Sequence, residues 1–401
     1  MHILLIGLHR FAQPTGLCRY TTSLFLALRK MPGVRVTLVL GSWQEEYYAK
    51  AFKLDVSDPE IIWVSLRAPA VSRYWWYMFG APKLARKLGA SVVHAVFPMP
   101  LLKSQFDCPI VTTVHDFYAW DSPETIGYPN VWLNKLVVRQ SVRTSDGVIS
   151  ISKVARQGLL RLFPRLLERM ALPVVYQVFS PKTLKHAVTS PSSTGAGSEF
   201  LLCVAQHRKH KNLDLAIEAF FKAVDRGILS PEANLVIVGS SGPQTRELHE
   251  LAARRPGVRF LTAIPDEQLA ELYRDCRAMI CTSSIEGFCL PVAEALTFSC
   301  RVVCSDIPIL REVAGEQGIY FPLDPRSADA IVDALQRSFR STRHLNRTSP
   351  ILEENFSQHG ANIYRQVLNR GSAEDAFTFA SAPEQAPIEA EHSRELQNTL
   401  T

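Results

Sequence analysis

Short apolar segments alternate with helix-length stretches along most of this chain, and the alternation is interrupted once. Apolar runs such as 3–6, 34–40 and 110–114 are separated by segments with helical periodicity. Such alternation predicts parallel βαβ units, whose sheet is buried on both faces. The interruption at 187–199 is rich in Ser, Gly and Pro, which predicts a linker. From residue 200 the alternation resumes, so the sequence predicts two consecutive α/β domains.

The length supports this division, because 401 residues exceed what one hydrophobic core usually organises. Parallel sheets bind ligands at the carboxyl ends of their strands, so two facing domains are expected to share a cleft. The end of the chain is acidic and rich in Ala, Pro and Glu, as disordered segments are. The predicted organisation is a first domain at 1–186, a linker at 187–199, a second domain at 200–350, a helix within 351–371 that packs back on the first domain, and a disordered tail at 372–401.

Composition excludes several classes of protein. With 47% hydrophobic and 20% charged residues the chain is not broadly disordered, and no apolar run reaches the roughly 18 residues of a membrane-spanning helix. The eight cysteines form no Cys-x-x-Cys pair, which argues against a zinc ribbon or a thioredoxin motif. The N-terminus lacks the pattern of a signal peptide, so we expect a reduced, cytoplasmic protein.

Charge is distributed unevenly over the chain. Residues 1–185 carry a net charge of +12 and the remainder −6, although the whole chain is only +6. A basic domain beside an acidic one indicates that the basic domain faces an anionic partner. The sequence holds no RNA-binding or zinc-finger motif and no arginine-rich tract, so nucleic acid is not expected. A membrane surface or a phosphate-bearing acceptor is the favoured partner.

Residues 281–297, CTSSIEGFCLPVAEALT, contain the strongest indication of a binding site. A predicted strand runs into a loop, and Pro291 then stands where a first helical residue is expected. A helix N-terminus attracts phosphate through its aligned peptide dipoles and its unpaired N–H groups. The backbone N–H groups expected to face a ligand are those of Gly287, Phe288 and Cys289.

Two glutamates, Glu286 and Glu294, lie on this loop and on the first turn of the following helix. Carboxylates accept hydrogen bonds from hydroxyls, so spaced glutamates suit a ligand with two hydroxylated rings around a phosphate. The alternative is structural, with Glu286 capping the helix and Glu294 solvated. The spacing Glu-x7-Glu, with its intervening Gly-Phe-x-Leu-Pro, resembles the signature of the retaining GT-B glycosyltransferases of family 4.

That resemblance extends over most of the chain and implies an α/β GT-B fold, in which two Rossmann-like domains face each other across a cleft. It implies that Glu286 binds sugar hydroxyls and takes part in catalysis, that the following amides hold the diphosphate, and that Glu294 binds the nucleotide ribose. Cys289 stands where the family usually has Gly, a departure expected to affect donor identity more than activity. The residues carried over to the donor site are Glu286, Gly287, Phe288, Cys289, Leu290 and Glu294.

A cluster of cations follows the first predicted strand of the second domain, in 206–212, QHRKHKN. Such a loop can neutralise a diphosphate, but it is equally well explained as a solvated turn. By resemblance to the family's Arg/Lys pair, Lys211 is a catalytic residue that stabilises the leaving nucleoside diphosphate. Gln206 stands at the family's usual arginine position, so Arg208 is taken as the second catalytic cation.

Further site residues are predicted at turns and strand ends. Gly16 resembles the family's glycine loop near the donor phosphates, although an isolated glycine is often an ordinary turn. His115 ends a predicted buried strand, where a lone His is commonly structural. By resemblance it contacts the donor sugar and helps to position the reaction centre, as a catalytic residue. Backbone groups expected to line the base pocket are those of Gly239, Ala263 and Ile264.

Two apolar and basic segments of the first domain, 73–79 and 154–172, are candidates for contact with an anionic bilayer. Enzymes related by the resemblance often glycosylate lipid-linked acceptors. Core packing is the alternative for both segments, and Pro164 is expected to break the second one.

Together these features predict a retaining glycosyltransferase that moves a hexose, with mannose favoured, from a nucleotide sugar to a polysaccharide or lipid-linked glycan acceptor. Two cations and the lack of an Asp-x-Asp motif predict that no metal ion or other cofactor is needed. We expect a cytoplasmic enzyme with peripheral contact to the inner face of the membrane. The alternatives are a non-catalytic nucleotide-sugar-binding partner subunit and a GT-B epimerase or phosphorylase. A Rossmann dehydrogenase is disfavoured, because the first loop lacks Gly-x-Gly-x-x-Gly.

Overall fold

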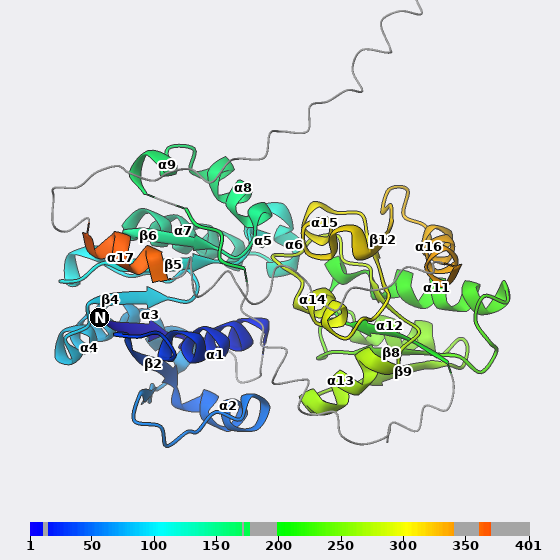
Figure 1. Cartoon of the computed structure of the whole chain (residues 1–401), viewed down its shortest axis with the longest axis horizontal. Coiled ribbons are helices and arrows are strands. Elements are labelled where there is room, and N and C mark those ends of the chain that lie inside the picture. The colour runs from blue at the N-terminus through cyan, green and yellow to red at the C-terminus, as the bar shows by residue number, and fades with distance from the viewer. Residues whose placement is uncertain (11–14, 171, 177–198, 341–360, 370–401) are drawn as a thin grey trace, which may run out of the picture.

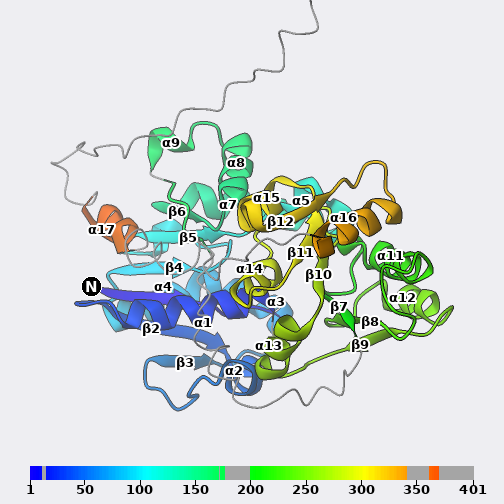
Figure 2. The ribbon, with the colours of Figure 1, turned by 45° about the vertical axis from the view of Figure 1, so that its right-hand side comes forward.

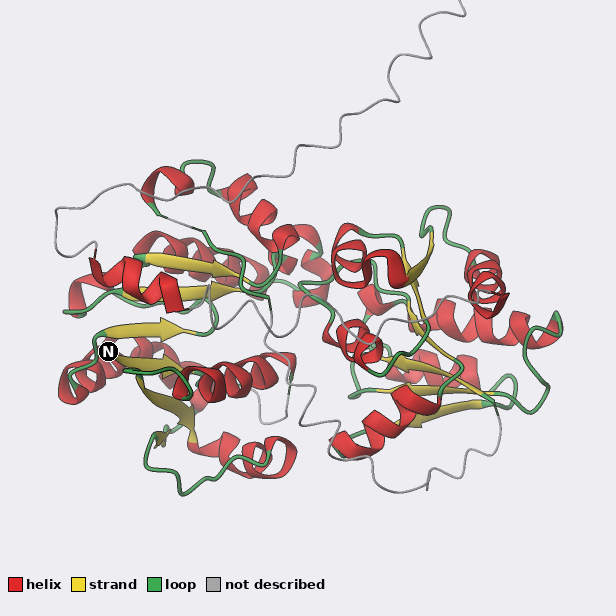
Figure 3. Cartoon of the chain, viewed as in Figure 1, coloured by secondary structure: helices red, strands yellow, loops and turns green. Residues whose placement is uncertain are grey.

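The computed structural model describes residues 1–10, 15–170, 172–176, 199–340 and 361–369. Within these ranges the chain forms two α/β domains, each built on a six-stranded parallel sheet with helices on its faces (Figures 1 and 3). The predicted alternation of strands and helices is therefore confirmed. The predicted linker, apart from Glu199, and the predicted tail lie outside the described residues.

The first sheet has the strand order β3-β2-β1-β4-β5-β6. All five residues of its central strand β1 are buried, as the strands of a sheet covered on both faces must be. Successive side chains alternate between the faces, so Ile3 and Leu5 belong to one core cluster and Leu4 and Ile6 to another. The strands are β1 (His2–Ile6), β2 (Arg35–Gly41), β3 (Ile61–Val64), β4 (Val92–Ala95), β5 (Ile110–Val114) and β6 (Gly147–Ser150).

The helices of the first domain follow the predicted pattern with one irregularity. A π-helical turn at Trp76–Gly80 joins α3 to α4, so the helical segment consists of three consecutive pieces. Pro164 separates α8 from α9, as expected of proline in a helical segment. The helices are α1 (Gly16–Arg29), α2 (Glu45–Phe52), α3 (Pro69–Trp75), α4 (Ala81–Leu88), α5 (Tyr118–Asp121), α6 (Pro123–Ile126), α7 (Asn130–Thr144), α8 (Lys153–Leu162) and α9 (Leu166–Arg169).

The second sheet has the order β12-β11-β10-β7-β8-β9, with β10 and β7 at its centre. Its strands are β7 (Phe200–Val204), β8 (Asn234–Val238), β9 (Val258–Leu261), β10 (Ala278–Cys281), β11 (Val302–Ser305) and β12 (Gly318–Phe321). Its helices are α11 (Leu213–Asp225), α12 (Thr245–Ala252), α13 (Asp266–Asp275), α14 (Leu290–Thr297), α15 (Pro308–Ala314) and α16 (Ala328–Arg340).

The last described helix, α17 (Ala361–Asn369), lies on the first domain although it follows the second in sequence (Figure 1). Its buried Tyr364 hydroxyl hydrogen-bonds Nδ1 of His94 on β4 at 2.6 Å. Ile363 and Val367 lie against the backbone of Gly147 at the start of β6. The chain therefore crosses between the two domains at least twice.

Contacts between the domains gather around α1, α8 and the helices α13 to α15. The start of α1 faces α13 and α14, and α8 lies beside α15 (Figure 2). The Ser152 hydroxyl donates to the carbonyl of Gly287 at 3.0 Å, and Glu312 accepts the backbone N–H of Lys153 at 2.7 Å. These contacts bring the carboxyl end of β5 close to the loop that follows β10.

The two segments considered for membrane contact are partly built into the core. Arg73 and Tyr77 are buried, whereas Trp75 and Phe79 are exposed and stack on each other with ring centroids 5.5 Å apart. On α8, Ala155 and Leu159 are buried. Among the described residues, no helix combines the length and the apolar character that a membrane span requires.

Candidate active site between the two domains

The loop between β10 and α14 lies at the face where the domains meet. Helix α14 begins at Leu290, one residue before the predicted start, so Pro291 is its second residue and not its first. Cys289 precedes the helix with a φ of +71°, in the left-handed region that glycine adopts without strain. The residue that departs from the family's usual glycine thus occupies a backbone conformation suited to glycine.

Glu286 and Lys211 form a largely buried ion pair at this face. Lys211 Nζ lies 2.5 Å from Glu286 Oε1, and their side chains are only 14% and 10% exposed. The Ser283 hydroxyl donates to the same oxygen at 2.7 Å. Burial alone would raise the pKa of Glu286, but the Lys211 ammonium and the bonds from Lys211 and Ser283 outweigh it and lower the pKa. Glu286 is therefore an ionised hydrogen-bond acceptor beside an ammonium group.

Glu294 lies deeper, in a network that reaches across to the first domain. The Tyr273 hydroxyl donates to its Oε2 at 2.8 Å, and Arg19 Nε lies 3.8 Å from its Oε1. Arg19 also binds Asp266 with two hydrogen bonds of 3.2 and 2.7 Å. Burial raises the pKa of Glu294, and the Arg19 charge opposes that rise. The structural alternative for Glu294 was a solvated side chain. This alternative is wrong, because the side chain is buried.

His115 ends β5 with its ring fixed by the backbone. Its Nε2–H donates to the carbonyl of Val96 at 2.7 Å, and Tyr20 packs edge-on at 4.8 Å between ring centroids. Burial lowers the pKa of His115 to about 4, although the bond to Val96 opposes the shift. The imidazole is therefore neutral near pH 7, with Nε2 protonated.

Two glycines permit close backbone contacts at the site. A Cβ on Gly287 would lie 2.4 Å from the His115 carbonyl oxygen, so only glycine lets the loop approach the end of β5 in the other domain. A Cβ on Gly239 would lie 1.9 Å from the carbonyl oxygen of Ala205 within the second domain. Both predicted glycine positions therefore have a steric reason to be glycine.

A cavity of about 220 Å³ opens beside the Glu286 loop. Its walls come from both domains and include the end of β5, α5, α8 and residues 285–287. Burial raises the pKa of Asp116, one of the lining residues, to about 6, and the nearby Glu286 charge adds to the shift. The polar and charged residues that line the cavity are His115, Asp116, Tyr118, Asp121, Gln157, Arg161 and Glu286.

The remaining predicted residues lie around this centre. Gly16 begins α1, and the nearest side chain to its missing Cβ is that of Leu290, at 3.9 Å, so the N-termini of α1 and α14 face each other. Phe288 is buried. Ala263, in the left-handed region at φ +51°, is exposed, and Ile264 is half-buried.

Arg208 directs its Nε to Gln206 Oε1 at 3.0 Å. It has no contact with the Lys211–Glu286 pair among the interactions of the described residues.

Sequence reasoning did not identify Arg19, Asp266, Tyr273 or Arg161 as neighbours of the site. Arg19 stands three residues after Gly16 on α1, so its place on that first turn was the available signal. Asp266 and Tyr273 lie on α13, and no spacing in the sequence connects that helix to Glu294. The contacts of Arg19 arise from the way the two domains pack, whereas Tyr273 meets Glu294 through the packing of α13 on α14 within the second domain.

Two α/β domains with parallel sheets that meet around the Glu286 loop match the GT-B architecture that the sequence resemblance implies. Residues 14–171 match the family described as Glycosyltransferase Family 4, and residues 190–354 match that described as Glycosyl transferases group 1. One match falls on each domain. The chain therefore belongs to the group 1, family 4 glycosyltransferases, it is a glycosyltransferase enzyme, and the predicted GT-B fold is confirmed.

Individual relatives agree with this assignment. The chain is 27% identical over 272 residues to O-antigen chain mannosyltransferase B of Escherichia coli, an alignment that covers 64% of this chain and 70% of the relative. It is 22% identical over 351 residues to O-antigen chain mannosyltransferase RfbU of Salmonella typhimurium, covering 83% and 91%. The structure of Anabaena HepE in complex with UDP-glucose superposes with a TM-score of 0.63 at 18% identity, covering 93% of this chain and all of that one (100%), which is a likeness of fold.

Proposed function

We propose that this glycosyltransferase transfers mannose from a nucleotide diphosphate sugar to a polysaccharide or lipid-linked glycan acceptor, with retention of configuration and without a metal ion. The observation that carries the proposal is the buried Lys211–Glu286 pair beside the N-terminus of α14. It offers a cation for the phosphate and a carboxylate for sugar hydroxyls within one small volume. The O-antigen mannosyltransferases among the relatives support mannose as the sugar and polysaccharide synthesis as the setting.

In this proposal the charge that develops on the leaving diphosphate is stabilised by Lys211 and by backbone N–H groups at the start of α14. Fixed donors aimed at developing charge supply the largest share of many enzymatic rate enhancements. The N-terminus of α1 at Gly16 faces the same region, and the positive end of its helix dipole adds to this charge. Arg208 joins them if its side chain turns away from Gln206 when the donor binds. These groups supply the positive charge for which other enzymes use a metal ion.

The carboxylates around the cavity bear on the route by which the proposed retention occurs. Glu286 is engaged by Lys211 and Ser283, and the buried Asp116 accepts the backbone N–H of Tyr118 at 3.2 Å. In this proposal neither carboxylate forms a covalent glycosyl ester. The proposed route is same-face attack by the acceptor, assisted by the departing phosphate, with neutral His115 positioning the donor sugar.

The cavity beside Glu286 is the proposed acceptor site. It is lined by the basic first domain, and Arg161 on its wall pairs with Asp121 at 2.5 Å. A phosphate or another anionic group on the acceptor can replace Asp121 as the partner of this guanidinium. The exposed Trp75 and Phe79 are proposed to rest on the cytoplasmic face of the membrane when the acceptor is lipid-linked.

Thermal-shift and calorimetric titrations with GDP, UDP, ADP and their sugars, with and without EDTA, test the donor assignment. We expect one diphosphonucleoside, GDP, to raise the melting temperature in an EDTA-insensitive way, because ligands stabilise the state that they bind. NMR of the product formed from GDP-α-mannose then reports the anomeric configuration, which retention predicts to be α. A β product would refute retention, loss of binding in EDTA would refute metal independence, and preference for another sugar would refute mannose as the donor sugar.

A further inference from the structure

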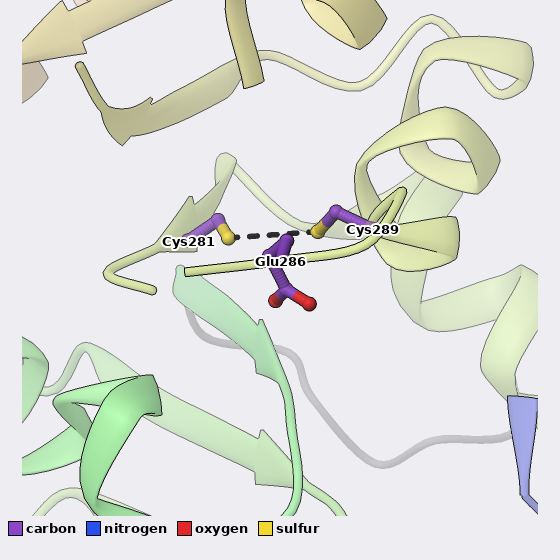
Figure 4. A group of neighbouring side chains, drawn as sticks. All are labelled: Cys281, Glu286 and Cys289. Atoms are coloured by element: carbon purple, nitrogen blue, oxygen red, sulfur yellow. Dashed lines mark hydrogen bonds between the residues drawn. The ribbon is translucent and has the colours of Figure 1, made fainter. Parts of the chain in front are cut away.

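Two thiols that the proposed reaction does not use lie directly behind Glu286. Cys281 ends β10 and Cys289 precedes α14, and their Sγ atoms are 3.7 Å apart. Both side chains are buried. Figure 4 shows the two sulfurs facing each other across the loop, with Glu286 between them in the chain and its carboxylate directed to one side. One ligand atom from each of these three residues lies within 4.8 Å of the others.

The spacing of these atoms fits a tetrahedral zinc ion. Zn–S bonds of about 2.3 Å at tetrahedral angles hold two sulfurs about 3.8 Å apart, close to the 3.7 Å between Cys281 and Cys289. A carboxylate oxygen bound to the same ion lies about 3.5 Å from each sulfur, so Glu286 needs only a side-chain rotation to join them. The fourth position stays open for water.

We propose that Cys281, Cys289 and Glu286 form a binding site for Zn²⁺, and that zinc bound there inhibits the enzyme. The two thiols lose their protons to solvent when zinc binds, which gives two thiolates and one carboxylate. Their three negative charges balance the +2 of zinc and the +1 of Lys211, so the buried cluster is neutral with metal bound as it is without it. Thiolates select zinc over magnesium, which prefers oxygen ligands.

Zinc can approach the Glu286 side of this site from solvent, and its binding there affects the proposed reaction. Glu286 and Gly287 line the open cavity, so the loop is reachable from solvent. The inhibitory part rests on the proposed function, in which Glu286 binds the donor sugar and the Cys289 amide holds the diphosphate. Zinc removes the carboxylate from the sugar and fixes the loop, so this metal is an inhibitor and not a cofactor of the reaction.

Direct metal binding tests the site without reference to activity. Metal-free protein kept reduced with a non-chelating phosphine is titrated with Zn²⁺ against a chromophoric chelator. We expect one Zn²⁺ per chain, and binding about 100-fold weaker in Cys281→Ser. Cys300→Ser is the matched control, because Cys276 and Cys300 form a second buried thiol pair, 3.2 Å apart, that is not part of the group around Glu286. No zinc binding by the native chain, or equal loss in Cys300→Ser, would overturn the site. Cys281→Ala gives a second test if the serine variant is unstable.

Inhibition is tested by donor binding and turnover with and without Zn²⁺. We expect one equivalent to lower both by at least about tenfold in the native enzyme. In Cys281→Ser, which keeps Glu286 and the loop amides, the same Zn²⁺ concentration should have little effect, and Mg²⁺ should have none in either. Zinc that binds stoichiometrically but leaves GDP-sugar binding unchanged would overturn the inhibitory role. If no nucleotide sugar binds any form, the proposed function fails, and the zinc stoichiometry still decides the metal site.

Discussion

Lys211 and Glu286 each depend on the other for their charge state. Removing one partner of a buried ion pair leaves the other uncompensated, which usually costs more than the pair itself contributes. With Lys211 gone, the burial that already acts on Glu286 would raise the pKa of this carboxyl. The two proposed functions of the pair, phosphate stabilisation and sugar binding, are therefore coupled, and a change at either residue is expected to affect both.

Lys211→Ala is expected to lower turnover by about 100- to 1000-fold, because one preorganised charge directed at the leaving group is lost. Steady-state assays of released diphosphonucleoside measure this change. Lys209→Ala is the matched control, since Lys209 stands in the same loop but is exposed. Full turnover in Lys211→Ala would show that the leaving group is stabilised by other residues.

Asp116 is expected to make the stability of the protein depend on pH. Its pKa rises from 3.8 to about 6 in the fold, mainly through burial, so folding favours the protonated form. Its stabilising contribution is complete below pH 3.8 and declines as the pH rises towards 6. Asp116→Asn should therefore raise the melting temperature relative to wild type more at pH 7.5 than at pH 4.5. Asp55→Asn, where hydrogen bonds from Ser57 lower the pKa, should show no such gain at neutral pH.

At the scale of elements, two glycines with the same steric constraint should respond differently to alanine. The Cβ of Gly287→Ala meets the His115 carbonyl in the other domain, so the clash is relieved by opening the domains. We expect turnover to fall at least about tenfold with little change in melting temperature. The Cβ of Gly239→Ala meets Ala205 within one domain, which leaves no such escape and is expected to cost about 1–3 kcal/mol of unfolding free energy. Equal melting temperatures for the two variants would contradict this distinction.

The elements were predictable because local rules govern them. Buried parallel strands give continuous apolar runs, so the runs at 3–6, 34–40 and 110–114 fall within one residue of the bounds of β1, β2 and β5. The exceptions depend on packing or on backbone detail. Helix α14 begins one residue before its predicted start, and the segment between α3 and α4 is a π-helical turn that no propensity indicates.

The site was predictable only where a motif spans few residues. Glu286 and the loop amides are close in sequence, and the end of β5 and the loop at Lys211 are brought to the same face by parallel topology. Arg19 and Tyr273 reach Glu294 from separate helices, one of them in the other domain. Such partners are fixed by how the two domains dock and by how helices pack within a domain, which periodicity and spacing do not encode. Arg208 shows the converse, since the sequence placed it at the phosphate and its guanidinium is turned to Gln206.

At the scale of the whole molecule, the two domains are held together by charges that α1 and α2 direct at α13. Arg19 makes a two-bond contact with Asp266 and also faces Glu294, with its side chain only 22% exposed. Lys53 pairs with Glu267 along the same interface, but there the lysine is 72% exposed. Exposed ion pairs contribute little because water screens them, whereas a partly buried guanidinium with two carboxylates contributes more. The first pair, and not the second, should therefore govern the closed arrangement.

Arg19→Ala is expected to open the cleft and to weaken diphosphonucleoside binding by about tenfold or more, because Glu294 loses the cation that holds it beside the proposed ribose position. Small-angle scattering should report a larger radius of gyration, and calorimetry the weaker binding. Lys53→Ala, which removes a cation from the same interface, should leave both unchanged. If Arg19→Ala keeps the compact radius yet loses binding, Arg19 acts on the ligand through Glu294 alone and closure has another cause. If both variants open the molecule equally, the interface responds to net charge and not to the buried geometry around Glu294.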